Sequence, residues 1–204
     1  MARVKLPDAI RTAVLREFNH RCAICGIANP QIHHIDEDPN NNDPENLLPL
    51  CPNCHLLDQH NPTVPVDPRK LSLFRRFKDP LILSSQFEPL FRRMLFLIEP
   101  TDNVFDYRRV LSASEELFEF VSVLQMGDFY GRQLRSLISR PAMPRCFVED
   151  TSDHERAHMA AEDARTHFNV IEAGGKRSIE LIVELLRYQK WDIYAPKRTD
   201  RESP

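Results

Sequence analysis

Apolar residues recur at helical spacing along most of the chain, and one stretch near the N-terminus follows a different pattern. Residues 7–20 predict a helix, because apolar side chains return there every three or four positions. In contrast, Gln31–Ile35 and Leu47–Leu50 have strand character, and an Asp/Asn/Pro-rich loop separates them. The stretch from Asn53 to His60 predicts a short helix. The N-terminal pattern is therefore helix, strand, loop, strand, helix.

The rest of the chain predicts helices. A proline-punctuated linker starts at Asn61, and a long apolar-rich helical stretch, Leu81–Ile98, follows it. Residues 112–115 resemble a capping box and predict a helix that runs to Gln125. A further helix opens at residues 152–155 and is expected to stop near Gly174 and Gly175, before a final amphipathic helix over residues 177–190.

These elements predict an α+β protein with a small N-terminal module and a mainly α-helical domain behind it. We place the module at residues 1–60, a Pro-rich linker with a basic segment at 61–80, and the helical domain at 81–204. The chain has 204 residues, of which 42% are hydrophobic, so a packed core is expected. The longest apolar run, Met94–Ile98, is too short to span a bilayer, and no secretory signal is visible. We therefore expect a cytoplasmic protein with reduced thiols and no membrane contact.

Charge is unevenly distributed along the chain. The net charge of −3 does not suggest a nucleic-acid-binding protein. Residues 69–78, however, carry five basic side chains and no acidic one: Arg69, Lys70, Arg75, Arg76 and Lys78. Such a patch suits a phosphate backbone, although a solvated helix face has the same composition.

Two C-x-x-C pairs dominate the N-terminal module. Cys22 with Cys25, and Cys51 with Cys54, have the spacing of a closed tetrahedral zinc site. A module this small cannot build a large core, so a structural zinc ion would supply much of its folding free energy. Zinc ribbons use the same ligands without any catalysis, so these cysteines alone do not indicate an enzyme. Cys146 is left over and is expected to be an inert thiol.

Histidines within the cysteine frame point to a second, open metal site. His33 and His34 are adjacent, and His55 directly follows the last cysteine of the frame. Neighbouring strand residues point to opposite faces, so His33 and His34 need different roles. His60 lies off the helical face of His55, and Asp36 is more typical of a solvated loop acid.

Residues 22–55 resemble an HNH endonuclease of the ββα-metal type. The stretches that carry the resemblance are Cys22-Ala-Ile-Cys25, His33-His-Ile-Asp36 and Asn46-Leu-Leu-Pro-Leu-Cys-Pro-Asn-Cys-His55. The resemblance implies that His34 is the general base, that Asn46 orients it, and that His33 and His55 bind the catalytic divalent ion. Many members of the family have Asp where this chain has His33.

One further motif, His154-Glu-Arg-Ala-His158, matches the zinc-peptidase pattern H-E-x-x-H. Its surroundings are charged, and it falls in the first turn of an expected helix. A solvated helix end is therefore the better interpretation, and we expect no metal there.

The favoured hypothesis is a metal-dependent endonuclease that hydrolyses DNA, with double-stranded DNA as the expected substrate. Residues 81–204 would bind a protein partner or form a homodimer, because a nuclease this small needs to be directed or restrained. By analogy, such a nuclease would serve as an effector of a bacterial defence system. Two alternatives remain open: a zinc-containing nucleic-acid-binding module without chemistry, and an interaction subunit that acts only inside a complex.

The expected ligand set predicts the metal preference of cleavage. Two imidazoles carry no negative charge and suit Mn²⁺ or Ni²⁺ better than Mg²⁺. We expect Mn²⁺ or Ni²⁺ to support plasmid cleavage at least as well as Mg²⁺, measured in a panel with EDTA as the blank. A strict requirement for Mg²⁺ would contradict His33 as a ligand.

Overall fold

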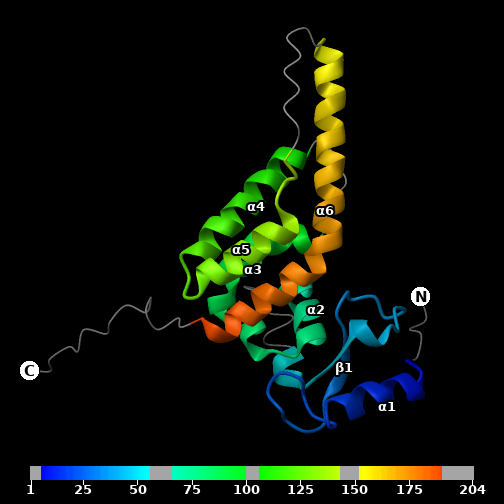
Figure 1. Ribbon diagram of the computed structural model, residues 1–204. Helices are drawn as coiled ribbons and strands as arrows, with labels where there is room; N and C mark the ends of the chain where they lie inside the picture. Colours follow the sequence, from blue (N-terminus) through cyan, green and yellow to red (C-terminus); the bar gives the residue numbers. More distant parts are fainter. Residues whose placement is uncertain (1–5, 56–65, 100–105, 143–151, 190–204) are drawn as a thin grey trace, which may run out of the picture. The chain divides into compact units, whose positions relative to one another are not determined.

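The computed structural model describes residues 6–55, 66–99, 106–142 and 152–189, and it divides into two compact units, Met1–Ser84 and Ser85–Pro204. Most of the described residues are helical, and a two-stranded sheet accompanies them (Figure 1). The expected mainly helical α+β class is therefore confirmed. No helix in the described ranges combines the length and the apolar character needed to cross a membrane.

The first unit is built around a short antiparallel hairpin. Its elements in chain order are α1 (Asp8–Glu17), β1 (Gln31–His34), η1 (Pro44–Asn46), β2 (Leu47–Leu50), α2 (Pro68–Phe77) and η3 (Pro80–Leu83). The register pairs His33 with Leu48 and His34 with Leu47. All four residues of β2 are buried, and α1 packs against this strand. The two strands predicted from the sequence are confirmed, and helical backbone follows them at residues 52–55.

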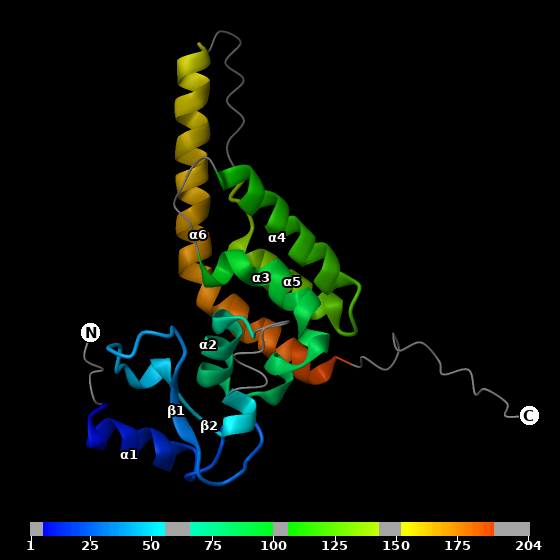
Figure 2. The ribbon, with the colours of Figure 1, turned by 180° about the vertical axis from the view of Figure 1, so that it is seen from behind.

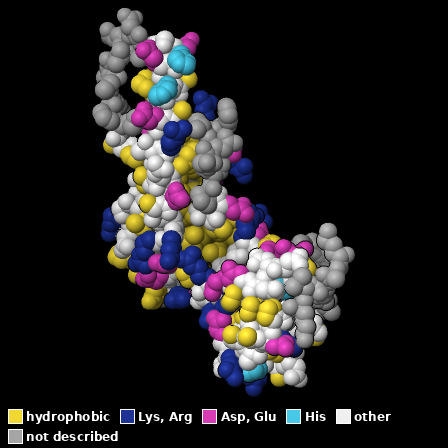
Figure 3. All heavy atoms as spheres, turned by 90° about the vertical axis from the view of Figure 1, so that its right-hand side faces the viewer, with side chains coloured by type: hydrophobic (Ala, Val, Ile, Leu, Met, Phe, Trp, Pro, Cys, Tyr) yellow, Lys and Arg dark blue, Asp and Glu magenta, His cyan; other side chains and the backbone are white. Residues whose placement is uncertain are grey.

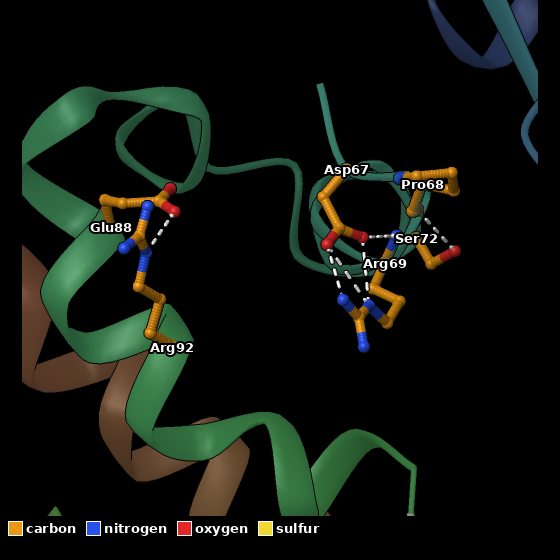
Figure 4. A network of polar contacts seen from close by, with 6 residues as sticks. All are labelled: Asp67, Pro68, Arg69, Ser72, Glu88 and Arg92. Carbon is orange, nitrogen blue, oxygen red and sulfur yellow. Dashed lines mark hydrogen bonds and ion pairs between the residues drawn. The ribbon is translucent and has the colours of Figure 1, made fainter. Parts of the chain in front are cut away.

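Helix α2 belongs to the first unit and is not part of a linker. The Asp67 side chain caps it by accepting a hydrogen bond of 2.8 Å from the backbone N–H of Arg69, and it also binds the Arg69 guanidinium (Figure 4). The helix ends at Lys78, which has a left-handed backbone conformation with φ of 52°. The boundary expected at residue 81 lies instead after Ser84, because α2 and η3 pack together within the first unit. Residues 61–65 of the expected linker lie outside the described residues.

The second unit is a helical assembly around one apolar core. It contains η4 (Ser85–Phe87), α3 (Glu88–Ile98), α4 (Tyr107–Ser122), α5 (Gly127–Ile138) and α6 (Asp153–Tyr188). Helices α4 and α6 each pack against both α3 and α5 (Figure 2). The core is filled by large apolar side chains, among them Phe87, Leu90, Met94, Leu117, Phe118, Leu134 and Ile182. Burial of this apolar surface is what stabilises the unit.

Several helix boundaries differ from the sequence prediction. The stretch Leu81–Ile98, predicted as one helical stretch, is divided into η3, η4 and α3. Residues 112–115 lie inside α4, which starts at Tyr107, so the predicted capping box is wrong. A capping box is present instead at Ser152 and Glu155, at the start of α6. Helix α6 also runs without interruption through Gly174 and Gly175, so the predicted stop there is wrong. The glycines serve a close helix contact: a Cβ on Gly174 would lie 2.3 Å from the Leu137 carbonyl oxygen. The ribbon of α6 bends in its orange part, in agreement with a glycine pair in a long helix (Figures 1 and 2).

This contact gives opposite expectations for two adjacent substitutions. Gly174→Ala forces a Cβ against the α5 backbone and should lower the free energy of unfolding by about 1–3 kcal/mol. Gly175→Ala is the matched control, because its Cβ meets its nearest atom, the Leu97 carbonyl oxygen, at 3.7 Å. Higher helix propensity should then stabilise that variant by about 0.5–1 kcal/mol. Chemical denaturation of both variants measures the difference, and equal effects would contradict the close crossing.

Candidate metal centre and active site

The four cysteines of the two C-x-x-C pairs converge on one point. All four sulfur atoms lie within 4.8 Å of one another, and Cys25 Sγ and Cys51 Sγ are 3.5 Å apart. Cys22, Cys51 and Cys54 are buried, whereas Cys25 is exposed. A tetrahedral zinc ion with bonds of about 2.3 Å holds its sulfur ligands roughly 3.8 Å apart. The cluster therefore fits a metal ion such as zinc.

Backbone hydrogen bonds shape the two cysteine turns. The Cys22 N–H donates to the Ile27 carbonyl at 2.8 Å, and the Gly26 N–H donates back to the Cys22 carbonyl at 3.0 Å. Gly26 has a φ of 73°, which favours glycine at this position. In the second turn, the Cys54 N–H approaches Cys51 Sγ at 3.4 Å. The first turn is also tied to the hairpin, since the Ala23 N–H donates to the Pro49 carbonyl at 2.8 Å.

The close packing of the four cysteine side chains changes the pKa values of their thiols. Burial raises the pKa of Cys22, but backbone N–H groups that point at its sulfur outweigh burial and lower the pKa to about 7. Burial and the neighbouring thiols instead raise the pKa of Cys54 above its ordinary value. Sulfurs packed this closely oppose one another's ionisation, so a cation is needed before all four can be thiolates.

Two of the predicted histidines lie together beside this cluster. The ring centroids of His33 and His55 are 5.0 Å apart, with an interplanar angle of 74°. His33 is buried, with 5% exposure, and His55 is half-buried. Two imidazoles that share one ion through nitrogens at about 2.1 Å keep their ring centroids roughly 5 Å apart. The two rings therefore lie close enough together for one ion to contact both, and their role as ligands stays a prediction.

His34 has different surroundings from His33. It is the last residue of β1 and is half-buried, and its Nε2 lies 3.4 Å from the Asn42 side-chain oxygen. A carbonyl oxygen can only accept, so this contact favours a proton on Nε2 and a bare lone pair on Nδ1. A neutral imidazole in this state can take a proton from water.

Asn46 acts on the loop and not on the His34 ring. Its side-chain oxygen accepts from the Asp36 N–H at 3.1 Å, and its amide nitrogen donates to Asp36 Oδ1 at 2.8 Å and to the Asn41 carbonyl at 3.0 Å. Burial raises the pKa of the Asp36 carboxyl, but hydrogen bonds from the side-chain amides of Asn41 and Asn46 outweigh burial and lower it. The contact with the His34 ring that was expected from Asn46 is made by Asn42, which the sequence reasoning missed. Asn46 therefore orders the turn that carries Asn42.

The basic residues of α2 do not form one open patch. Arg75 and Lys70 are buried, and Arg75 binds the Glu17 carboxylate. Lys78 also pairs with Glu17, at 2.6 Å, and Arg69 pairs with Asp67. A phosphate-binding surface on this helix would therefore lack Lys70 and Arg75. Arg75 lowers the pKa of the Glu17 carboxyl to about 2, with help from Lys78.

The H-E-x-x-H motif lies on the exposed first turns of α6. His154 and His158 are both exposed, and histidine side chains stand on the surface at that end of the helix (Figure 3). Glu155 has a structural role, because its carboxylate accepts from the Ser152 N–H at 2.8 Å in the capping box. In the described part of the chain, the four cysteines are the cluster of three or more ligands that can hold a metal. His60 and Cys146 lie outside the described residues.

A buried polar network in the second unit was not predicted. Asp163 accepts a hydrogen bond of 3.2 Å from the Tyr107 hydroxyl and pairs with Arg140. One turn further along α6, the fully buried His167 places Nε2 3.0 Å from the Ile138 carbonyl oxygen. The network joins α4, α6 and the end of α5, and its members are too far apart in sequence to form a motif. We interpret the network as a set of structural contacts that hold these helices together.

The cysteine cluster predicts metal-dependent folding of the first unit. We expect one zinc ion per chain by elemental analysis, and Cys51→Ala should reduce it to near zero and unfold the first unit, since structural zinc contributes on the order of 10 kcal/mol. His154→Ala is the matched control and should keep the full zinc content. Zinc that is lost in the His154 variant, or kept in the Cys51 variant, would contradict the assignment.

Comparisons with protein-family models, with curated proteins and with solved structures gave no match to this chain. The chemistry of the site therefore follows from the positions of its cysteines, histidines and asparagines.

Proposed function

We propose that the chain is a metal-dependent endonuclease that hydrolyses phosphodiester bonds in DNA. The observation that carries the proposal is the pairing of the His33 and His55 rings, 5.0 Å apart, beside a four-cysteine cluster. A purely structural zinc site would need the four cysteines but would not need the pair of imidazoles. The sulfur cluster and the imidazole pair support the ββα-metal architecture that the sequence resemblance implies.

Each residue of the site has one role in this proposal. The four cysteines would hold a structural zinc ion, and His33 with His55 would hold a divalent ion, Mn²⁺, Ni²⁺ or Mg²⁺. When bound, a divalent ion at this position would supply positive charge beside the scissile phosphate and the departing 3′ oxygen. His34 takes the proton of the attacking water as the new P–O bond forms and the P–O3′ bond breaks, and the departing 3′ oxygen takes a proton from solvent water. The products carry a 5′-phosphate and a 3′-hydroxyl.

The geometry around His34 supports its role as the base. Asn42 contacts Nε2, which leaves Nδ1 as the proton acceptor. Consecutive Cα atoms are about 3.8 Å apart, so the base and one metal ligand are anchored at the end of the same short strand. Asn46 holds the turn that follows this strand through Asp36.

The charge arrangement distinguishes this proposal from a binding module without chemistry. A module that only retains DNA needs open cations, but Arg69, Arg75 and Lys78 all pair with carboxylates of the first unit. We therefore favour the enzyme, with weak and salt-sensitive DNA binding of its own. The helical second unit would bind a protein partner or a second copy of the chain, as in defence effectors.

The test is plasmid nicking by the full chain in the presence of Mn²⁺. His34→Ala should lower the cleavage rate by about 100- to 10,000-fold, because it removes the general base. Zinc content and thermal unfolding should stay close to the wild type, since His34 is a half-buried residue at the end of β1 and is not one of the four cysteine ligands. His154→Ala, which removes an exposed histidine of the second unit, is the control and should cleave at the wild-type rate. Wild-type cleavage by the His34 variant would overturn the proposal.

A further inference from the structure

Arg75 is the most buried charged side chain of α2, and its guanidinium binds both α1 and η1. Its side chain is 3% exposed. Its two terminal nitrogens donate to the two Glu17 carboxylate oxygens at 2.8 and 2.7 Å. Its Nε and one terminal nitrogen also donate to the Pro44 carbonyl oxygen, at 3.1 and 3.0 Å. The guanidinium thus joins the end of α1 to the first residue of η1.

The Pro44 carbonyl lies at the start of the segment that orders the proposed active site. Two residues later, Asn46 closes η1 and binds Asp36 through both side-chain atoms. The Asn46 carbonyl also accepts from the Ile35 N–H at 2.8 Å, directly after His34. The same turn carries Asn42, which contacts the His34 ring. A shift of η1 would therefore move the partners of His34.

We propose that Arg75 is a positioning residue for the hydrolysis: it fixes η1, and through Asn46 and Asp36 it fixes the turn that orients His34. This inference rests on the proposed function and adds to it a residue that contacts neither DNA nor metal. The role needs arginine, because a planar guanidinium can serve a carboxylate and a carbonyl at once, whereas a lysine ammonium is a point charge.

A positioning role of Arg75 and a phosphate contact by Arg75 predict different kinetic effects when the side chain is replaced. A phosphate contact contributes to DNA binding, so its loss raises KM, and lysine would replace it. A positioning residue acts on the reacting geometry, so its loss lowers kcat, and lysine would not restore it. Small misplacements of a catalytic group cost as much as about 100-fold in rate.

The experiment measures kcat and KM for plasmid cleavage with Arg75→Met, Arg75→Lys and the wild type. It also measures hydrogen exchange of the Asp36 backbone N–H, which reports on the bond to Asn46 without any activity. Arg92→Met is the matched control, because Arg92 pairs on the surface of α3 with Glu88 four residues earlier (Figure 4). Arg92→Met removes one positive charge, as Arg75→Met does, but at a position far from the site along the chain.

We expect both Arg75 variants to lose about 10- to 100-fold in kcat, with KM within about twofold of the wild type and faster exchange at Asp36. The Arg92 variant should match the wild type in all three quantities. A rise in KM alone, full activity of Arg75→Lys, or unchanged exchange at Asp36 would overturn the inference.

Two further outcomes remain decisive. If the wild type does not cleave DNA, the proposed function fails, and exchange at Asp36 alone decides whether Arg75 orders the turn. If Arg75→Met loses zinc or unfolds, Glu17→Gln replaces it, because it loosens the guanidinium without touching η1 or Asn46. That variant should show the same changes in kcat and exchange to a smaller extent, and wild-type values for both would overturn the inference.

Discussion

The convergence of four cysteine sulfurs is the constraint on which the first unit depends. Its two strands have four residues each, too few to bury a large core of their own. The cluster joins the turn at Cys22 and Cys25 to the turn that follows β2, so it closes the open end of the hairpin, where Gln31 pairs with Leu50. It also places the imidazoles: His55 directly follows Cys54, and His33 lies on the strand paired with β2. Loss of the cluster would therefore remove the fold and the His33–His55 pair together.

Two basic side chains at the end of α2 bind the same carboxylate at the end of α1. Arg75 and Lys78 share the Glu17 carboxylate and both lie over the Phe18 ring, at 5.3 and 5.5 Å from its centroid. Loss of Glu17 would leave the buried Arg75 guanidinium without its carboxylate partner, which is costly. A chain with a net charge of −3 that uses its basic residues in this way has few cations left in α2 for DNA. The nuclease that we propose would therefore need something other than charge alone to position it on its substrate.

Short-range patterns in the sequence were enough to predict the hairpin, the cysteine cluster and the approach of His33 to His55. These depend on residue type and spacing within about forty positions. The role of Arg75 could not be predicted, because its partner Glu17 is 58 residues away and nothing in the local pattern distinguishes it from Arg76. The uninterrupted course of α6 through Gly174 could not be predicted either. The need for a glycine there comes from the backbone of α5, which lies far away in the sequence. The contact of Asn42 with the His34 ring was not predicted, because the sequence does not show which asparagine of the loop reaches the ring once the turn is folded.

The central claim is that His33 and His55 bind one divalent ion next to a separate zinc site. Pulsed electron paramagnetic resonance of Mn²⁺ added to the zinc-loaded chain tests this claim most directly, because nitrogen ligands modulate the manganese signal. We predict modulation from two imidazole nitrogens, reduced to one in His33→Ala and in His55→Ala and unchanged in His154→Ala. Manganese that shows no nitrogen coupling in the wild type, or the same coupling in all variants, would contradict the account.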